Sequence, residues 1–137
     1  MSKFHLQLPS IKSAYSIQYP ERTMLIGSCF TENMGAKMQH HLFETLENPH
    51  GILFNPISVF HAIDDYIEKK EYKESDLFPL NDIWNSWHHH TRFSGVTKED
   101  ALQKINTSID RAHQFLQSAN HLVITLGSAW VYQLTRD

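Results

Sequence analysis

The chain has 137 residues, a formal net charge of −3, 41% hydrophobic residues and 20% charged residues. These values are typical of a single globular domain and argue against disorder, because enough apolar surface is available to offset the entropy of ordering the chain. The small negative charge gives no electrostatic reason to expect nucleic acid or an anionic membrane surface as a partner.

The cysteine count and the hydropathy of the chain indicate its cellular compartment. Cys29 is the single cysteine, so no disulfide can form within the chain, which fits a reducing compartment. No apolar run approaches the roughly 20 residues needed to span a bilayer. Residues 1–20 lack the apolar stretch of a secretory signal. The sequence therefore predicts a cytoplasmic protein.

The first 27 residues predict an arm followed by a strand. Residues 1–22 contain Pro9 and Pro20 and show no clear period, so we expect an extended amino-terminal arm. Residues 24–26 form a short apolar run that ends at Gly27, which is typical of a buried central strand.

The following segment predicts a long helix. Apolar side chains recur every four positions from residue 31 onward, which places them on one helical face; they are Met34, Met38, Leu42 and Leu46. This helix should end within residues 48–51, a cluster of turn-forming residues. Residues 52–54 are candidates for a short strand.

A second helix is predicted to begin at Asn55 and Pro56, because Asn is a good N-cap and Pro suits the first helical position. Its apolar period continues to about Lys70. Residues 71–96 show no regular pattern and are rich in aromatic residues and histidine.

The last third of the chain predicts a helix and a strand. Thr97 and Asp100 resemble a capping box, and the apolar positions within 102–116 alternate steps of three and four. Residues 122–126 form a second apolar run, which again ends in a glycine, Gly127.

Strands that alternate with helices predict an α/β domain built on a parallel sheet. The strand at 122–126 is apolar enough to need cover on both faces, yet only residues 127–137 follow it. A doubly wound sheet usually carries about five strands. The sequence therefore predicts a domain that is incomplete at its carboxyl end, with an open strand edge that favours self-association.

Ser28 is the first candidate for chemistry. In open parallel sheets, ligands bind at the carboxyl ends of the strands, and both predicted strands end in Gly-Ser. Ser28 is expected between a strand and a helix start, where backbone N–H groups stabilise a developing oxyanion. Two readings remain open from local sequence: Ser28 is a helix cap, or it is a nucleophile. Cys29 is a rival nucleophile, because a helix start lowers the pKa of a thiol.

Residues 27–30, Gly-Ser-Cys-Phe, resemble the motif that names the GSCFA family, with Thr31 in place of the final Ala. Residues 51–56, 87–95 and 125–132 resemble the family in the same order. The resemblance implies a three-layer, SGNH-hydrolase-like (flavodoxin-like) α/β fold over residues 23–137. It also implies that Ser28 is the nucleophile of an ester or acyl hydrolase.

The resemblance also implies backbone or amide donors for an oxyanion hole. It points to Gly51 or Asn55, with Ser28 and Gly127 as further candidates. SGNH enzymes carry Gly-x-Asn in the third block, whereas residues 127–129 are Gly-Ser-Ala. The asparagine donor is therefore missing, which costs ~2.7–4 kcal/mol in the transition state unless a residue such as Asn55 replaces it.

The resemblance also implies a catalytic Asp-x-x-His near the carboxyl terminus, and these residues contain none. A serine hydroxyl is a poor nucleophile without a base, so we expect little or no hydrolase activity from residues 1–137 alone. A histidine of the loop at 88–90 is a further candidate base.

The loop at 84–95 predicts a substrate cleft lined by aromatic, imidazole and guanidinium groups: Trp87, His88, His89, His90 and Arg92. Such groups suit a small-molecule or carbohydrate ester. Consecutive histidines diverge on any regular backbone, so the pattern disfavours a metal site, and we expect neither a metal nor another cofactor.

Two alternatives belong to other functional classes. The first is a non-catalytic remnant or binding module of the same fold, and the second is a small metal-binding protein built on the histidine loop. The remaining histidines, which include His50, are interpreted as incidental.

Overall fold

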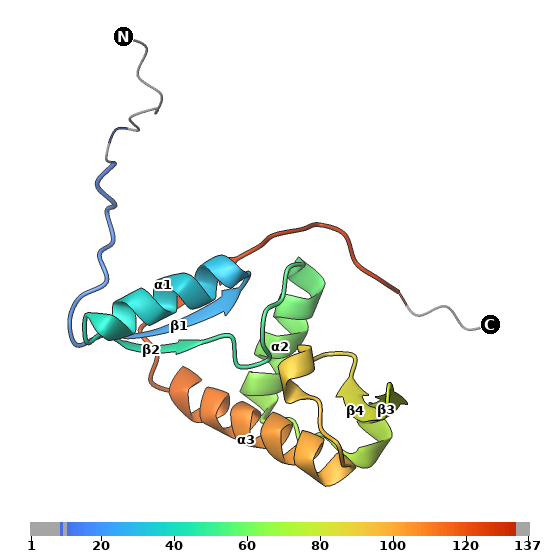
Figure 1. Ribbon diagram of the computed structural model, residues 1–137. Coiled ribbons are helices and arrows are strands. Elements are labelled where there is room, and N and C mark those ends of the chain that lie inside the picture. Colours follow the sequence, from blue (N-terminus) through green and yellow to red (C-terminus); the bar gives the residue numbers. More distant parts are fainter. Residues whose placement is uncertain (1–8, 10, 134–137) are drawn as a thin grey trace.

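A three-stranded parallel sheet lies at the centre of the computed structural model, which describes residue 9 and residues 11–133 (Figure 1). The strand order is β2–β1–β5, and both neighbours run parallel to the central strand. The strands are β1 (Arg22–Gly27), β2 (Glu44–Glu47) and β5 (His121–Thr125). The predicted α/β class with a parallel sheet is therefore confirmed.

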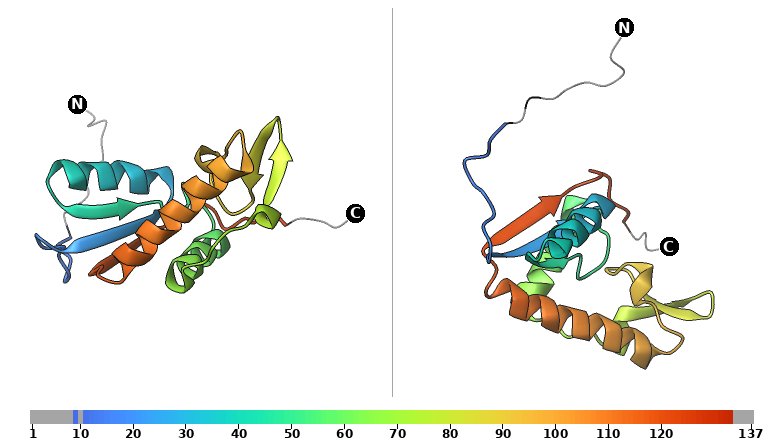
Figure 2. Two further views of the ribbon diagram at one scale, coloured as in Figure 1. Left: turned by 90° about the horizontal axis from the view of Figure 1, so that it is seen from below. Right: turned by 60° about the vertical axis from the view of Figure 1, so that its left-hand side comes forward.

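Helices cover the sheet on both sides (Figures 1 and 2). Helix α1 (Cys29–His40) lies on one face, and α2 (Pro56–Glu68) and α3 (Lys98–Leu116) lie on the other. The main core lies between the sheet and the second pair of helices, and its buried members include Met24, Ile26, Leu46, Val59, Ala62, Tyr66, Ala112 and Phe115. Burial of these side chains supplies the main stabilisation of the domain.

Several local predictions are confirmed. Residues 24–26 are buried in β1 as expected, with at most 3% of each side chain exposed. Asn55 caps α2, since its side-chain oxygen accepts from the Ser58 N–H at 2.8 Å. Thr97 caps α3 in the same way, with the Asp100 N–H as donor.

The predicted long helix after Thr31 is wrong. Helix α1 ends at His40, and Leu42 adopts a left-handed conformation (φ 64°) with its side chain exposed. The chain then returns as β2, whose Leu46 packs in the core opposite Met24. Pairing with β1 satisfies the backbone of residues 44–47, and this tertiary effect overrides the four-residue spacing.

The predicted strand at 52–54 is also not formed as a regular strand. Residue 53 is nevertheless tied to the sheet, because the Leu53 N–H donates to the Gly27 carbonyl at 2.9 Å. Residues 71–96, predicted to be irregular, contain a hairpin of β3 (Leu77–Leu80) and β4 (Ile83–Ser86). Short 3₁₀ helices flank it at Glu74–Asp76 and Thr91–Phe93.

Strand β5 forms an edge of the sheet (Figure 2). The apolar side chains of this strand lack the cover that such a strand needs, as the prediction of an open edge implies, since Leu122 and Ile124 are 43% and 41% exposed within the described residues. Both residues align with Met24 and Ile26 of β1, and they extend the face that α2 and α3 cover only in part. Residues 11–20 are exposed and lead away from the helices.

The turn from β1 into α1 is sterically narrow. Gly27 has φ 138°, which L side chains rarely adopt, and a Cβ built on it would lie 1.9 Å from the Thr125 carbonyl oxygen. A side chain at this position would push β5 away from β1. The glycine therefore allows the two parallel strands to end side by side.

We expect Gly27→Ala to lower the free energy of unfolding by at least ~2 kcal/mol, because it combines backbone strain with a clash against fixed backbone. Urea denaturation followed by circular dichroism measures this. Gly127→Ala is the matched control, since a Cβ there would meet the exposed ring of Phe54, which is free to turn. Equal effects of the two substitutions would contradict the steric argument.

Candidate functional site

Ser28 lies at the carboxyl end of the central strand and at the N-cap position of α1. Its hydroxyl makes no capping bond to the helix. The hydroxyl instead lies 3.0 Å from the hydroxyl of Thr125, the last residue of β5. The side chain is half-buried, so the oxygen is held by its neighbour and still reachable from solvent.

Three hydroxyl groups meet at this point. The Thr125 hydroxyl accepts from the Ser28 N–H at 3.1 Å and is also hydrogen-bonded to the hydroxyl of Thr31. Thr31 is fully buried in the first turn of α1. This residue stands where the GSCFA motif has Ala, so the departure from the motif adds a polar group directly behind Ser28.

A buried amide positions the turn. Asn48 is fully buried, and its side-chain oxygen accepts from the Gly27 N–H at 2.8 Å. Its own backbone N–H donates to the Leu25 carbonyl at 2.9 Å. Asn48 therefore joins the end of β2 to the end of β1, and it fixes the direction in which the chain enters α1.

The predicted oxyanion donors are engaged within the chain. The N–H of Ser28 donates to the Thr125 carbonyl at 3.0 Å, that of Gly51 to Asn48 at 2.8 Å, and that of Gly127 to Phe54 at 2.8 Å. The side-chain amide of Asn55 donates to the Ser58 hydroxyl at 2.9 Å. The three backbone N–H groups therefore have acceptors already, whereas the side-chain amide of Asn55 keeps a second N–H and stays a candidate donor.

The predicted substrate loop separates into two parts. Trp87 and His88 line a cleft of about 850 Å³ together with Asn55 at the start of α2. His89 points into the interior instead, where it is only 9% exposed. Of the three candidate histidines in the loop, only His88 lines this cleft, because neighbouring side chains leave the backbone in different directions.

His90 and Arg92 have structural contacts away from this cleft. His90 accepts from the Arg92 N–H and caps the short helix that follows. The Arg92 guanidinium bonds to the Glu32 carboxylate at 2.8 Å and to the backbone carbonyl of Asn48. Arg92 thus braces α1 against the end of β2, and the prediction that it lines the cleft with Trp87 is not supported by the geometry.

A buried polar cluster lies beneath the loop, and sequence analysis missed it. His50 is 1% exposed, and its two ring nitrogens bond to the Tyr66 hydroxyl at 2.8 Å and to the Asp65 carboxylate at 3.1 Å. The Tyr72 hydroxyl donates to the same carboxylate at 2.7 Å. His89 stacks on His50 with ring centroids 4.0 Å apart. His50, interpreted from sequence as incidental, is therefore the centre of this cluster.

The family can now be assigned. A comparison with protein-family models matches residues 22–137 to the GSCFA family. The chain belongs to the GSCFA family. No curated protein and no solved structure matches it. The resemblance first noted in four short segments is thus confirmed over almost the whole chain.

The GSCFA chain keeps its buried histidines uncharged. Burial, together with the nearby His50, lowers the pKa of His89 to about 2, and burial also lowers the pKa of His50 despite its bond to Asp65. Burial would raise the pKa of Asp65, but hydrogen bonds from His50 and Tyr72 outweigh it and hold this pKa at about 2. A carboxylate accepting from a neutral imidazole is the resulting state at pH 7.

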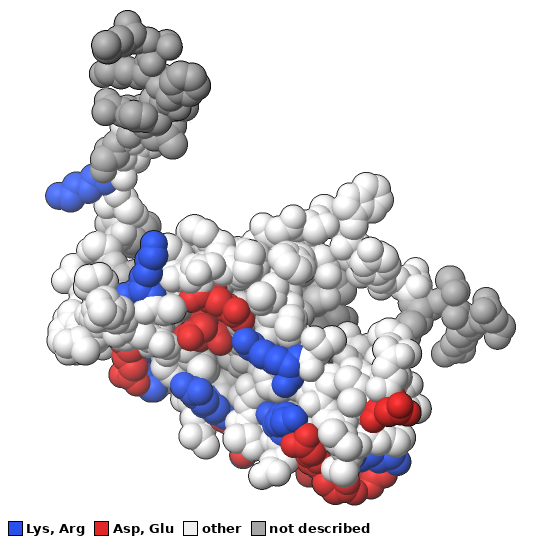
Figure 3. All heavy atoms as spheres, viewed as in Figure 1, with Lys and Arg blue, Asp and Glu red and all other residues white. Residues whose placement is uncertain are grey.

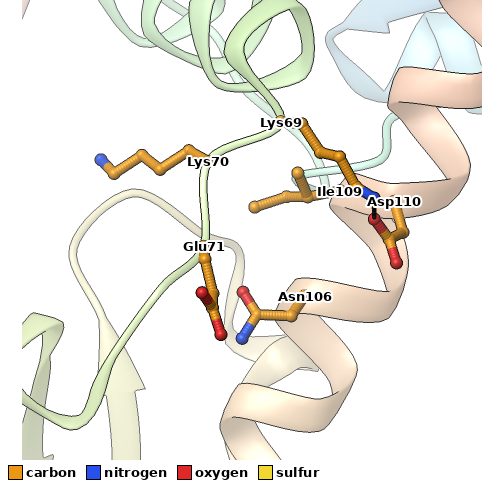
Figure 4. A pocket seen from close by; sticks show the side chains of 6 residues that line it. All are labelled: Lys69, Lys70, Glu71, Asn106, Ile109 and Asp110. Atoms are coloured by element: carbon orange, nitrogen blue, oxygen red, sulfur yellow. Dashed lines mark ion pairs between the residues drawn. The ribbon is translucent and has the colours of Figure 1, made fainter.

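A second hollow of this GSCFA domain lies between the end of α2 and α3, with a volume of about 390 Å³ (Figure 4). Lys69 forms an ion pair with Asp110 across it at 3.0 Å, and Lys70 points away (Figure 4). Asn106 uses its amide to bond both backbone groups of Tyr72. Lys69, Asp110 and Asn106 are therefore engaged within the chain, and we do not assign a site to this hollow.

Two wider observations concern cofactors and membranes. Within the described part of the GSCFA chain, no three His, Cys, Asp or Glu side chains are grouped as metal ligands. Among the described helices, none combines the length and apolarity that a bilayer crossing requires.

Sequence signals for the missed residues were weak but present. Asn48 lies in the predicted turn at 48–51, and a polar residue directly after a strand is placed to reach the end of the neighbouring strand. Thr125 lies in the predicted strand at 122–126, just before the Gly-Ser pair at 127–128. The parallel register sets Thr125 beside Gly27 and thereby beside Ser28.

We expect the neutral histidines to make the domain sensitive to acid. A histidine that stays neutral in the folded state takes up a proton on unfolding once the pH falls below its ordinary pKa of 6.5, so stability is lost as the pH falls. His89 contributes a loss of about 2 kcal/mol between pH 6.5 and pH 5. The contribution of Asp65 is lost only below its ordinary pKa of 3.8 and does not enter this range.

Urea unfolding of wild type, His89→Gln and His41→Gln at pH 7 and pH 5 measures this effect. His89→Gln should reduce the difference between the two pH values, whereas His41→Gln, at an exposed position, should leave it unchanged. An identical pH dependence in all three proteins would show that His89 does not control acid stability.

Proposed function

We propose that the chain carries the nucleophile of an SGNH-type serine hydrolase acting on esters or acyl groups, with Ser28 as that nucleophile. The observation that supports this most directly is the hydroxyl of Ser28, which occupies an N-cap position without capping the helix. A serine at this position usually bonds to the N–H groups of the first turn. Here that hydroxyl remains available for a reaction.

The neighbouring hydroxyls are suited to orient the Ser28 proton. A threonine hydroxyl has two acceptor sites and one donor. If Thr125 accepts from the Ser28 N–H and from the Thr31 hydroxyl, its own proton is left for the Ser28 oxygen. The proton of Ser28 is then free to point away from Thr125, toward a base. We infer that Thr125 is a positioning residue and not itself a base.

The oxyanion donors in this proposal differ from those expected from sequence. The first N–H groups of a helix have no intrahelical acceptor. In α1, the Thr31 N–H donates to the Ser28 carbonyl at 3.0 Å. The N–H groups of Cys29 and Phe30 are then the nearest to Ser28 that the helix leaves free. The positive end of the helix dipole adds to their effect on a developing negative charge.

The general base is not among the hydrogen-bond partners of Ser28. Within the described residues, the Ser28 hydroxyl bonds to no histidine, and His50 and His89 are committed to the buried cluster. We therefore propose that the base comes from outside residues 1–137, either from a longer chain or from a partner, with an SGNH-like three-layer fold completed around the same sheet. The exposed free thiol of Cys29 fits a cytoplasmic location for this enzyme.

A binding module without turnover is the second candidate. It is favoured by the intramolecular bonds of Gly51, Gly127 and the Ser28 N–H, which leave fewer oxyanion donors than a typical esterase presents. In that case the cleft at Asn55 and Trp87 would be the functional part of the molecule, and Ser28 would be structural.

Labelling with a fluorophosphonate probe separates the two candidates. We expect the full-length protein to be labelled at Ser28, with labelling abolished in Ser28→Ala and retained in Cys29→Ala. Residues 1–137 alone should react about 10² to 10⁴ times more slowly, because they lack the general base. Thr125→Val should slow labelling of the full-length protein, and Thr125→Ser should restore it.

Mass spectrometry of the labelled peptide identifies the site. An unlabelled, folded full-length protein would favour the binding module, and a label on Cys29 would assign the reactivity to the thiol.

We also propose that residues 1–137 self-associate through β5. This edge strand carries neither lysine nor proline, which natural edges use to prevent pairing, and it exposes Leu122 and Ile124. Analytical ultracentrifugation should show dimers or larger species. Ile124→Lys should shift them toward monomer, and Val96→Lys, at an exposed apolar position outside the sheet, should not. A wild-type monomer at high concentration would contradict the proposal.

A further inference from the structure

The cleft at the start of α2 has an uncharged lining. Its walls come from three places: the first turns of α2, the loop after β4, and residues 131–133. None of the described residues that line it is Asp, Glu, Lys or Arg. Figure 3 shows the same trend on one face of the molecule, where charged side chains gather over α1 and α3 and are absent over the segment that follows β5.

His88 does not add charge to the wall of the cleft at neutral pH. Burial lowers the pKa of His88, so its imidazole is neutral at pH 7. The ring of His88 lies 5.8 Å from that of His61 on α2. The charged groups nearest to His88 are Lys70 and Asp65, which are paired with each other at 3.4 Å. An anionic ligand such as a phosphate would find no free cation among these described groups.

Trp87 provides an exposed aromatic face that is already held in place. Its ring stacks on Phe78 of β3, with centroids 3.8 Å apart and planes 13° from parallel. The side chain is nevertheless 62% exposed, so the face opposite Phe78 is open. The β3–β4 hairpin fixes Phe78, which in turn orders the Trp87 ring. Little side-chain conformational entropy is therefore lost when a flat ligand ring covers the free face of Trp87.

Neutral hydrogen-bonding groups surround this face. Ser58 accepts from the Asn55 amide at 2.9 Å, so its hydroxyl proton is free to be donated elsewhere. His88 and Gln133 add donors and acceptors without charge, and the ring nitrogens of His61 lie in the same wall. A ring with apolar C–H groups on its face and hydroxyls around its rim matches both features, whereas an acyl chain would leave the polar groups unpaired.

We propose that this cleft is a binding site for an uncharged saccharide, with one sugar ring stacked on the free face of Trp87. The backbone links this site to the Ser28 turn, because Asn55 lies two residues after Leu53, whose N–H donates to the Gly27 carbonyl at 2.9 Å. This inference rests on the proposed function in one respect, that the sugar carries the ester which Ser28 attacks. Binding itself requires no turnover.

The test uses the full-length protein on an array of neutral oligosaccharides covering gluco, galacto, manno, xylo and N-acetylhexosamine series, followed by isothermal titration calorimetry of the hits. We expect saturable binding of at least one series, weakened about tenfold by Trp87→Ala and largely kept by Trp87→Phe. Trp130→Ala is the matched control, because Trp130 is exposed and does not line the cleft. Circular dichroism establishes that each variant is folded.

Each outcome is informative for one of the two proposals. Binding that persists in Ser28→Ala supports the saccharide site even if the fluorophosphonate experiment fails. No binding to any series, equal binding by Trp87→Ala, or tighter binding of the nucleoside adenosine than of any saccharide would overturn the inference and leave the Ser28 proposal to its own test.

Discussion

A single buried amide determines where the sheet of this GSCFA protein ends and its first helix begins. The Asn48 side chain accepts from the Gly27 N–H at 2.8 Å, and the Leu53 N–H donates to the Gly27 carbonyl at 2.9 Å. Because Gly27 has no Cβ, the Thr125 backbone can approach it closely. Ser28 follows directly, so its position depends on these contacts. Leaving this buried amide without its partner would lower the free energy of unfolding by about 1–3 kcal/mol. This cost favours the observed arrangement over alternatives that break the bond.

The molecule divides its polar residues between two tasks. At the carboxyl edge of the sheet, Ser28 and Thr125 keep hydroxyl groups near the surface. Below the loop after β4, the bonds of His50 to Asp65 and Tyr66 keep polar groups in the interior. The second group stabilises the loop that presents Trp87, since the His90 N–H donates to the His50 carbonyl at 2.9 Å. The buried histidines thus support the cleft without entering it.

The sequence predicted those features that depend on neighbouring residues. Asn55 and Thr97 cap their helices because a cap is a local interaction, and the apolar run at 24–26 is a buried strand in any α/β fold. Prediction from the sequence failed for features whose interacting residues lie far apart in the chain. The spacing from Met34 to Leu46 is equally compatible with a helix and with the observed helix, turn and strand, and pairing with β1 decides between them. The hydrogen bonds of the His50 ring join residues that are 15 and 16 positions apart, so no local sequence pattern predicts them.

The Ser28 hydroxyl does not cap its own helix, and we propose that it is positioned for a base. A crystal structure of the active protein tests this through the distance from Ser28 Oγ to the nearest imidazole nitrogen. We expect a histidine from outside residues 1–137 within about 2.6–3.2 Å of that oxygen, with the Thr125 contact retained. A Ser28 hydroxyl turned onto the N–H groups of Thr31 or Glu32, with no base in reach, would contradict it.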